Sequence, residues 1–149
     1  MTRHHSSADL IRIEALRGMQ RSQAQAAAVE ALATERRVLA QLEWARAERD
    51  EALARWHEQL SSPGFSPEMA TALAGALNRS DEGAASAGEA ADRAASERAE
   101  CDYVWRQSDA HCRQAASLLA TSRRREARKR DEKAIEVAAD RMALVWRRQ

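Results

Sequence analysis

The sequence predicts an all-α protein that forms an elongated, antiparallel two-helix coiled-coil hairpin. The chain has 149 residues, of which 34 are alanine and 32% are charged, whereas only 4% are aromatic. Five glycines and two prolines leave long stretches without a helix breaker. Such an excess of alanine and charged residues is typical of long helices that bury narrow apolar stripes and not a broad core.

The first predicted helix begins near residue 8 and reaches Leu60 without a proline, with Gly18 as its one glycine. Leu42 and Trp56 share one position of a seven-residue repeat. Five further large apolar residues share a second position of that repeat: Ile11, Leu32, Leu39, Leu53 and Leu60. A heptad of this kind predicts a long helix with one thin apolar stripe.

Residues 61–67 interrupt this helix, because Pro63-Gly64 and Ser66-Pro67 exclude a regular helix. Ser66 suits the N-cap of a new helix, in which Pro67 would take the first position. A second turn signal follows at residues 78–83, Asn-Arg-Ser-Asp-Glu-Gly. Residues 84–148 contain no proline, and we expect them to form the second long helix.

The two turn signals compete for the tip of the hairpin. A reversal at 61–67 would leave the residues from about 120 onward without a partner, whereas a reversal at 78–83 gives arms of equal length. The second register pairs apolar residues, although it brings arginines 36–37 near 124–125. These pairs are Trp56 with Trp105, Leu42 with Leu119, Met19 with Met142, and Leu16 with Val145.

We therefore predict a single domain, residues 1–149, with its tip near 78–83. Its first arm would span 8–78, interrupted at 61–67, and its second arm 84–148. Large flat side chains suit a seam that is otherwise lined by alanine. All four tryptophans are thus predicted to fill the seam: Trp44, Trp56, Trp105 and Trp146.

The charge is balanced overall but uneven along the chain. The net charge is +1, yet residues 81–102 carry seven acids and two arginines, and residues 117–149 carry ten bases and five acids. No apolar run approaches the ~18 residues that span a bilayer, and the first residues lack the apolar part of a signal peptide. We expect a cytoplasmic protein without membrane insertion.

The sequence offers no signature of catalysis, and we predict a non-enzyme without a cofactor or metal. It has neither a dinucleotide-binding nor a phosphate-binding glycine motif, and His57 and His111 are isolated. Cys101 and Cys112 would lie roughly 16 Å apart along one helix, too far for a disulfide. They are interpreted either as small seam residues or as thiols available to another chain.

The basic stretch 122–130, Ser-Arg-Arg-Arg-Glu-Ala-Arg-Lys-Arg, could contact phosphates. No aromatic residue is interleaved with its six bases, and acids follow at once, so a solvated face or a protein-docking patch is favoured over nucleic acid. A four-residue spacing places Phe65, Met69, Leu73 and Leu77 on one helix face. This strip either packs on the second arm or contacts another protein.

With its length, its alanine-rich hairpin and the Phe-x-x-x-Met-x-x-x-Leu strip at residues 65–73, the chain resembles the YscO/FliJ stalk proteins of bacterial type III secretion and flagellar export. The resemblance covers residues 8–148. Proteins of this family are similar to the coiled coil of the rotary ATP synthase gamma subunit. They occupy the pore of a hexameric export ATPase, link it to the export gate and can bind export chaperones.

The resemblance implies a non-enzymatic central stalk at the cytoplasmic face of a membrane-embedded secretion apparatus. It assigns the contact with the export-gate cytoplasmic domain to Phe65, Met69, Leu73 and Leu77. It assigns the ATPase contact to the paired helix ends, with Arg12, Arg17, Arg21, Arg141, Arg147 and Arg148. The alternative function is a generic coiled-coil adaptor, or a nucleic-acid-binding helical protein that uses residues 122–130.

Overall fold

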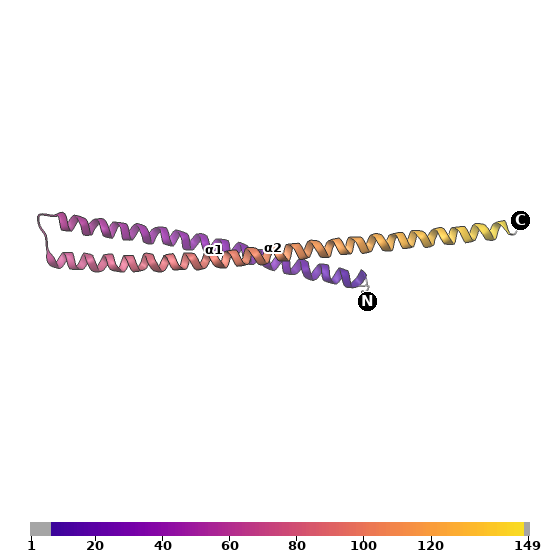
Figure 1. The fold of residues 1–149 in the computed structure, drawn as a ribbon, viewed down its shortest axis with the longest axis horizontal. Coiled ribbons are helices and arrows are strands. Elements are labelled where there is room, and N and C mark those ends of the chain that lie inside the picture. The colour runs from indigo at the N-terminus through magenta and orange to yellow at the C-terminus, as the bar shows by residue number, and fades with distance from the viewer. Residues whose placement is uncertain (1–6, 148–149) are drawn as a thin grey trace. The chain divides into compact units, whose positions relative to one another are not determined.

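Two long helices make up the computed structural model, which describes residues 7–147 apart from the side chain of Val145. Helix α1 comprises Ser7–Ser61 and helix α2 comprises Pro67–Trp146. The two helices run antiparallel and are joined by one short connection (Figure 1). The described residues include no strand, so the predicted all-α helical hairpin is confirmed.

The chain reverses at residues 62–66, which contain Pro63 and Gly64 and are followed directly by Pro67. The last turn of α1 ends with a hydrogen bond from the backbone N–H of Ser62 to the carbonyl of Gln59, at 3.3 Å. Helix α2 then begins as the sequence predicts: the hydroxyl of Ser66 accepts a hydrogen bond from the backbone N–H of Met69, at 3.4 Å. Pro67 takes the first helical position, where its missing N–H costs nothing.

The predicted tip at residues 78–83 is wrong, because α2 continues through this segment. The segment contains no proline, and Gly83 in a helix costs only about 1 kcal/mol relative to alanine. Ser80 is also accommodated within the helix, since its hydroxyl donates to the carbonyl of Ala76 at 2.9 Å. The two arms are therefore residues 7–61 and 67–146, not 8–78 and 84–148.

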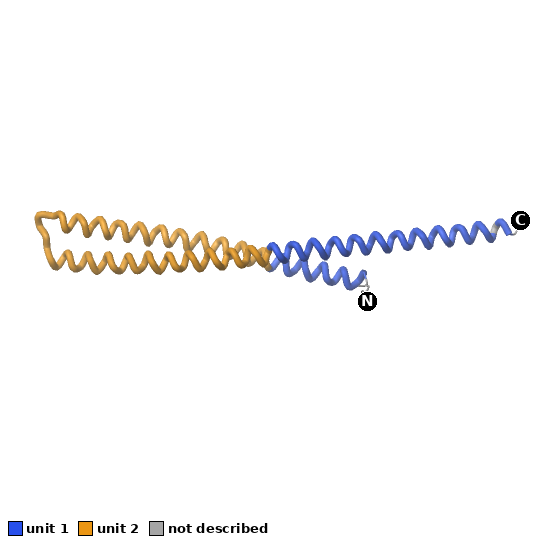
Figure 2. Tube along the Cα trace, in the orientation of Figure 1, with its two compact units in different colours: residues 1–23, 106–149 blue, residues 24–105 orange. Residues whose placement is uncertain are grey.

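The chain divides into two compact units, coloured separately in Figure 2. Unit 2 comprises residues 24–105 and so contains the connection together with the parts of α1 and α2 on either side of it. The described part of unit 1 comprises residues 7–23 of α1 and 106–147 of α2.

A narrow seam joins the helices of unit 2, and the buried or half-buried residues that form it recur along each helix at steps of three and four. On α1 these are Ala24, Ala28, Ala31, Glu35, Val38, Leu42, Ala45, Arg49, Ala52, Trp56 and Gln59. On α2 they are Ala70, Leu73, Leu77, Ser80, Ala84, Ala87, Ala91, Ala94, Arg98, Cys101 and Trp105. The mean step of 3.5 residues is that of a left-handed coiled coil.

The predicted stripe of α1 is correct at one of its two heptad positions. Leu42 and Trp56 lie in the seam. Of the five residues at the other position, Leu32 is half-buried beside the seam, and the other four are exposed: Ile11, Leu39, Leu53 and Leu60. The second seam position belongs mostly to alanine. Alanine at this position buries little apolar area, and the exposed leucines lie at the edge of the seam.

The seam of unit 1 is more polar than that of unit 2. Its buried residues are Ala115 and Leu119. The half-buried residues at the other seam positions include Ser7, Leu10, Glu14, Arg17, Ser108, Cys112, Ser122 and Glu126. Cys112 here and Cys101 in unit 2 are free thiols at seam positions, as one of the two interpretations of the sequence expected.

Two ion pairs set the register of the opposed helices. In unit 2, Nη1 of Arg98 lies 2.9 Å from Oε2 of Glu35, and in unit 1, Nε of Arg21 lies 2.6 Å from Oδ1 of Asp109. In a hairpin, the numbers of two opposed residues add to about twice the number of the residue at the turn. Here they add to 133 and 130, close to twice the middle of the 62–66 connection. The register preferred from the sequence is therefore wrong, and the pairs that it predicted do not face one another: Trp56 with Trp105, Leu42 with Leu119, Met19 with Met142, and Leu16 with Val145.

The four tryptophans do not share one environment. Trp56 and Trp105 are half-buried in the seam, but Trp44 and Trp146 are 68% and 79% exposed. The prediction that all four fill the seam is thus wrong for two of them, because residues 44 and 146 fall outside the heptad positions of the seam.

Candidate interaction surfaces

The turn of the hairpin presents apolar side chains to solvent. Phe65 lies in the connection and Met69 in the first turn of α2, and each is 52% exposed. Leu73 and Leu77, which the sequence placed in the same strip, are half-buried at seam positions. The structure therefore divides the predicted strip into an exposed half at the turn and a half that holds the two helices together.

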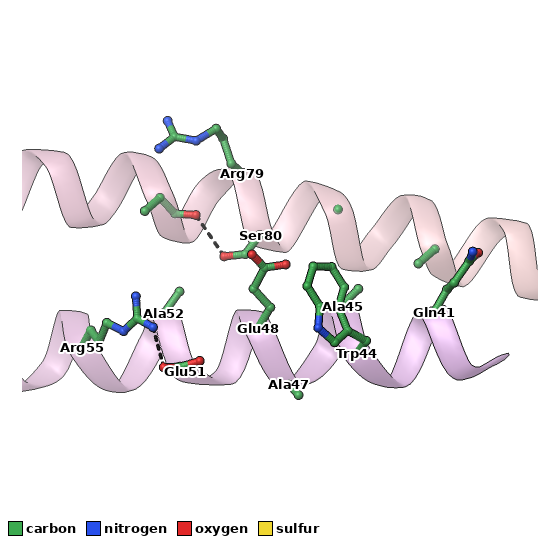
Figure 3. A pocket seen from close by; sticks show the side chains of 13 residues that line it. Gln41, Trp44, Ala45, Ala47, Glu48, Glu51, Ala52, Arg55, Arg79 and Ser80 are labelled. Atoms are coloured by element: carbon green, nitrogen blue, oxygen red, sulfur yellow. Dashed lines mark hydrogen bonds and ion pairs between the residues drawn. The ribbon is translucent and has the colours of Figure 1, made fainter. Parts of the chain in front are cut away.

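An open groove of about 840 Å³ lies along one flank of the seam in unit 2 (Figure 3). On the α2 side it is lined by small residues and Arg79: Ala76, Arg79, Ser80, Gly83 and Ala87. On the α1 side its lining includes Gln41, Trp44, Ala45, Glu48, Ala52 and Arg55. A side chain added at Gly83 would meet nothing within 4 Å, so the floor of the groove is open there.

Charged groups rim this groove. Arg55 forms an ion pair with Glu51 one turn earlier, and the hydrogen bond between them raises the pKa of Arg55. Glu48 and Arg79 also line the groove, from opposite helices, and neither makes an ion pair with a described residue (Figure 3). Sequence reasoning missed this surface, because it exists only in the register that brings Ala76 and Gly83 beside Trp44 and Glu48.

The basic stretch 122–130 lies on α2 within unit 1. Its six bases are exposed, whereas Ser122 and Glu126 are half-buried at seam positions. Exposed Arg130 approaches the half-buried Glu126, one helical turn earlier, at 3.9 Å. The basic side chains are therefore solvated and surround the narrow seam contact made by Ser122 and Glu126. Besides Arg130 they are Arg123, Arg124, Arg125, Arg128 and Lys129.

Residues 127–146 of α2, here called the overhang, bury no described side chain. The described part of α1 begins at Ser7, which the register of unit 1 places opposite about residue 123. The seam positions continue along the overhang as four charged residues followed by Ala143; the four are Lys129, Lys133, Glu136 and Asp140. Ile135, Met142 and Trp146 lie on a different face of the helix and are 69%, 63% and 79% exposed.

The arginines assigned to the ATPase contact are not brought together at paired helix ends. Arg12, Arg17 and Arg21 lie on α1, where Arg17 donates to Gln20 at 2.9 Å and Arg21 pairs with Asp109. Arg141 is on the overhang and Arg147 follows it directly, both exposed, and Arg148 lies outside the described residues. The register places Arg12 opposite about residue 118, which is roughly 35 Å along α2 from Arg141.

Residues 7–147 contain no group of three or more histidine, cysteine, aspartate or glutamate side chains that could hold a metal ion. Neither described helix has a stretch apolar enough and long enough to span a bilayer.

Comparison with known proteins finds no matching family model, no similar curated protein and no similar solved structure.

Proposed function

We propose that this chain is the non-enzymatic central stalk of a bacterial type III export apparatus, linking a hexameric export ATPase to the export gate at the cytoplasmic face of the membrane. The observation that carries the proposal is an antiparallel coiled coil with an alanine-lined seam that exposes Phe65 and Met69 at its turn. A narrow coiled coil suits a ring-shaped ATPase, and an apolar turn suits a grip on a partner.

In this proposal Phe65 and Met69 bind the cytoplasmic domain of the export gate, because both are large, apolar and outside the seam. Leu73 and Leu77 support the turn from within the seam. The arginines of unit 1 and the overhang contact the ATPase. The groove beside Trp44 and Glu48 is available to a helix of an export chaperone.

The experiment is the binding of Phe65→Ala with Met69→Ala to a purified export-gate cytoplasmic domain from the same organism. Anchors at an interface can each contribute about 2 kcal/mol, so we expect at least tenfold weaker binding. The matched control is Leu39→Ala with Leu53→Ala, which also removes two exposed apolar side chains from unit 2. It should bind like the wild type.

Thermal melting of both variants distinguishes loss of the binding contact from loss of the folded chain. Equal loss in both variants, or a loss that follows the unfolded fraction, would refute the assignment of the turn. A wild-type chain that binds neither the export gate nor the ATPase at micromolar concentration would refute the stalk itself.

The alternative function is the binding of nucleic acid through residues 122–130. One observation supports it, which is that the six basic side chains of this stretch are exposed. Arg124→Glu with Arg128→Glu tests it. Duplex binding by the wild type at physiological salt, lost in this variant with a smaller salt dependence, would replace the stalk with this alternative. We expect no such binding.

A further inference from the structure

The overhang carries an apolar stripe that does not continue the seam shared with α1. Past Glu126 the seam positions are occupied by four charged residues before Ala143: Lys129, Lys133, Glu136 and Asp140. Four apolar residues instead share another face, with steps of four, three and four: Ile135, Ala139, Met142 and Trp146. Val137 and Leu144 lie on the side away from this stripe. This change of helix face means that the overhang is built to pair with a different helix, from a different side.

A helix of this length needs a partner. Twenty residues without tertiary contact form a marginal helix in water, and the stabilisation of helices in proteins comes mainly from packing of an apolar face. All of the described side chains of the overhang are exposed. We propose that the partner is the overhang of a second copy of this chain, bound antiparallel along this stripe.

The stripe is complementary to itself in the antiparallel direction. A two-fold axis between residues 140 and 141 brings Ile135 opposite Trp146 of the second copy and Ala139 opposite Met142, each contact occurring twice. Every layer then contains at least one large side chain. Parallel pairing would stack Trp146 on itself and Ala139 on itself, which overfills one layer and leaves a void in the other.

Charge favours the same direction. Residues 123–130 carry six bases and one acid. Parallel pairing would place the two basic stretches side by side. Antiparallel pairing separates them by roughly 40 Å along the dimer, which is several times the Debye length of about 8 Å at physiological salt.

The contact is short, so the dimer is a reversible one. The stripe covers three turns of helix, which places it at the low end of specific interfaces. The chain therefore exchanges between monomer and dimer as its concentration changes. This property belongs to the free chain and stands whether or not the chain is a stalk.

Sedimentation equilibrium of the full chain tests the dimer. The wild type should move from the mass of one chain, 16.6 kDa, toward that of two as its concentration rises from micromolar to millimolar. Ile135→Glu with Trp146→Glu should stay at one chain throughout. The control, Val137→Glu with Leu144→Glu, changes two exposed apolar residues on the other side of the overhang and should behave like the wild type.

The helicity of each variant is measured with its mass, so that a variant that loses the overhang helix is recognised. A wild type that remains at one chain up to millimolar concentration would overturn the proposal, as would masses beyond two chains. Equal behaviour of the two variants would also overturn it, because the stripe would then not be the contact.

The direction is tested by distances between spin labels in the dimer, in a chain with Cys101→Ala and Cys112→Ala. Labels at Ala143→Cys should lie within about 20 Å of each other across the axis, whereas labels at Lys129→Cys should lie roughly 35 Å or more apart. Short distances at both sites would show parallel pairing and refute the proposal.

Discussion

Two mostly buried carboxylates at the seam each pair with an arginine of the opposite helix. Glu35 is 14% exposed at its side chain and pairs with Arg98, which also reaches Asp102 at 3.6 Å. Asp109, 15% exposed, receives both Arg21 and Arg113 at 2.6 Å. A charge that is mostly removed from water is costly without a partner, so these pairs penalise every register that separates them.

Arg98→Ala should therefore destabilise the hairpin more than an ordinary loss of a surface arginine. It leaves the Glu35 carboxylate in the seam without its partner, which should lower the free energy of unfolding by about 1–2 kcal/mol. Urea denaturation measures the change. The control is Arg93→Ala, whose exposed pair with Glu89 at 3.7 Å should contribute less than about 0.5 kcal/mol.

Glu35→Ala in the Arg98→Ala background should recover part of the loss, because it removes the unpaired carboxylate. If Arg98→Ala and Arg93→Ala cost the same, the pair does not fix the register.

The four residues of the apolar strip should divide by their effect on stability. Leu77→Ala removes a half-buried seam side chain and should lower the free energy of unfolding by about 2 kcal/mol. Met69→Ala removes an exposed side chain and should change it by less than about 0.5 kcal/mol. Thermal melting of the two single variants checks this, and similar costs would contradict the division of the strip.

At the scale of the helices, a glycine distinguishes the two candidate turns. Gly83 lies inside α2, and a Cβ there would meet nothing within 4 Å. Gly83→Ala should thus raise the free energy of unfolding by about 0.5–1 kcal/mol through helix propensity alone. Gly88→Ala, equally open, is the companion measurement. Destabilisation by Gly83→Ala in a denaturant titration would indicate a turn at 78–83.

The overhang should be dispensable for the stability of the rest of the chain. Its described side chains bury no seam contact, so a chain that ends at Glu126 should melt within a few degrees of the full chain at low micromolar concentration. Circular dichroism of the two chains measures both melting and helical content. A shortened chain that fails to fold would show that residues beyond 126 contribute to the seam.

Across the whole molecule, protection from hydrogen exchange should follow the burial of the seam. Amides of residues 127–146 should exchange first, because no packed partner opposes their opening. Amides around Leu42 and Ala91 should exchange last, since the buried residues of unit 2 are concentrated there. Equal protection along all of α2 would contradict this order.

Only part of this structure follows from local sequence signals. The helix start at Pro67 was predictable, because a serine cap and a first-position proline act within one turn. The place of the reversal was not predictable, because the sequence carries turn signals at both 61–67 and 78–83. Only the packing of the two helices against each other shows which of them is used. The exposed half of the strip, Phe65 and Met69, and the groove beside Trp44 likewise depend on the register and not on the residues themselves.

The sequence by itself determined that the chain is helical, that proline interrupts it at 63 and 67, and that alanine lines a narrow contact. Helix propensity and proline geometry are local, so composition is enough to set them. Tertiary structure decided the register, the exposure of Leu39 and Leu53, and the exposure of the overhang. An alanine seam accepts many alignments at similar cost, and the ion pairs of Glu35 and Asp109 select one among them.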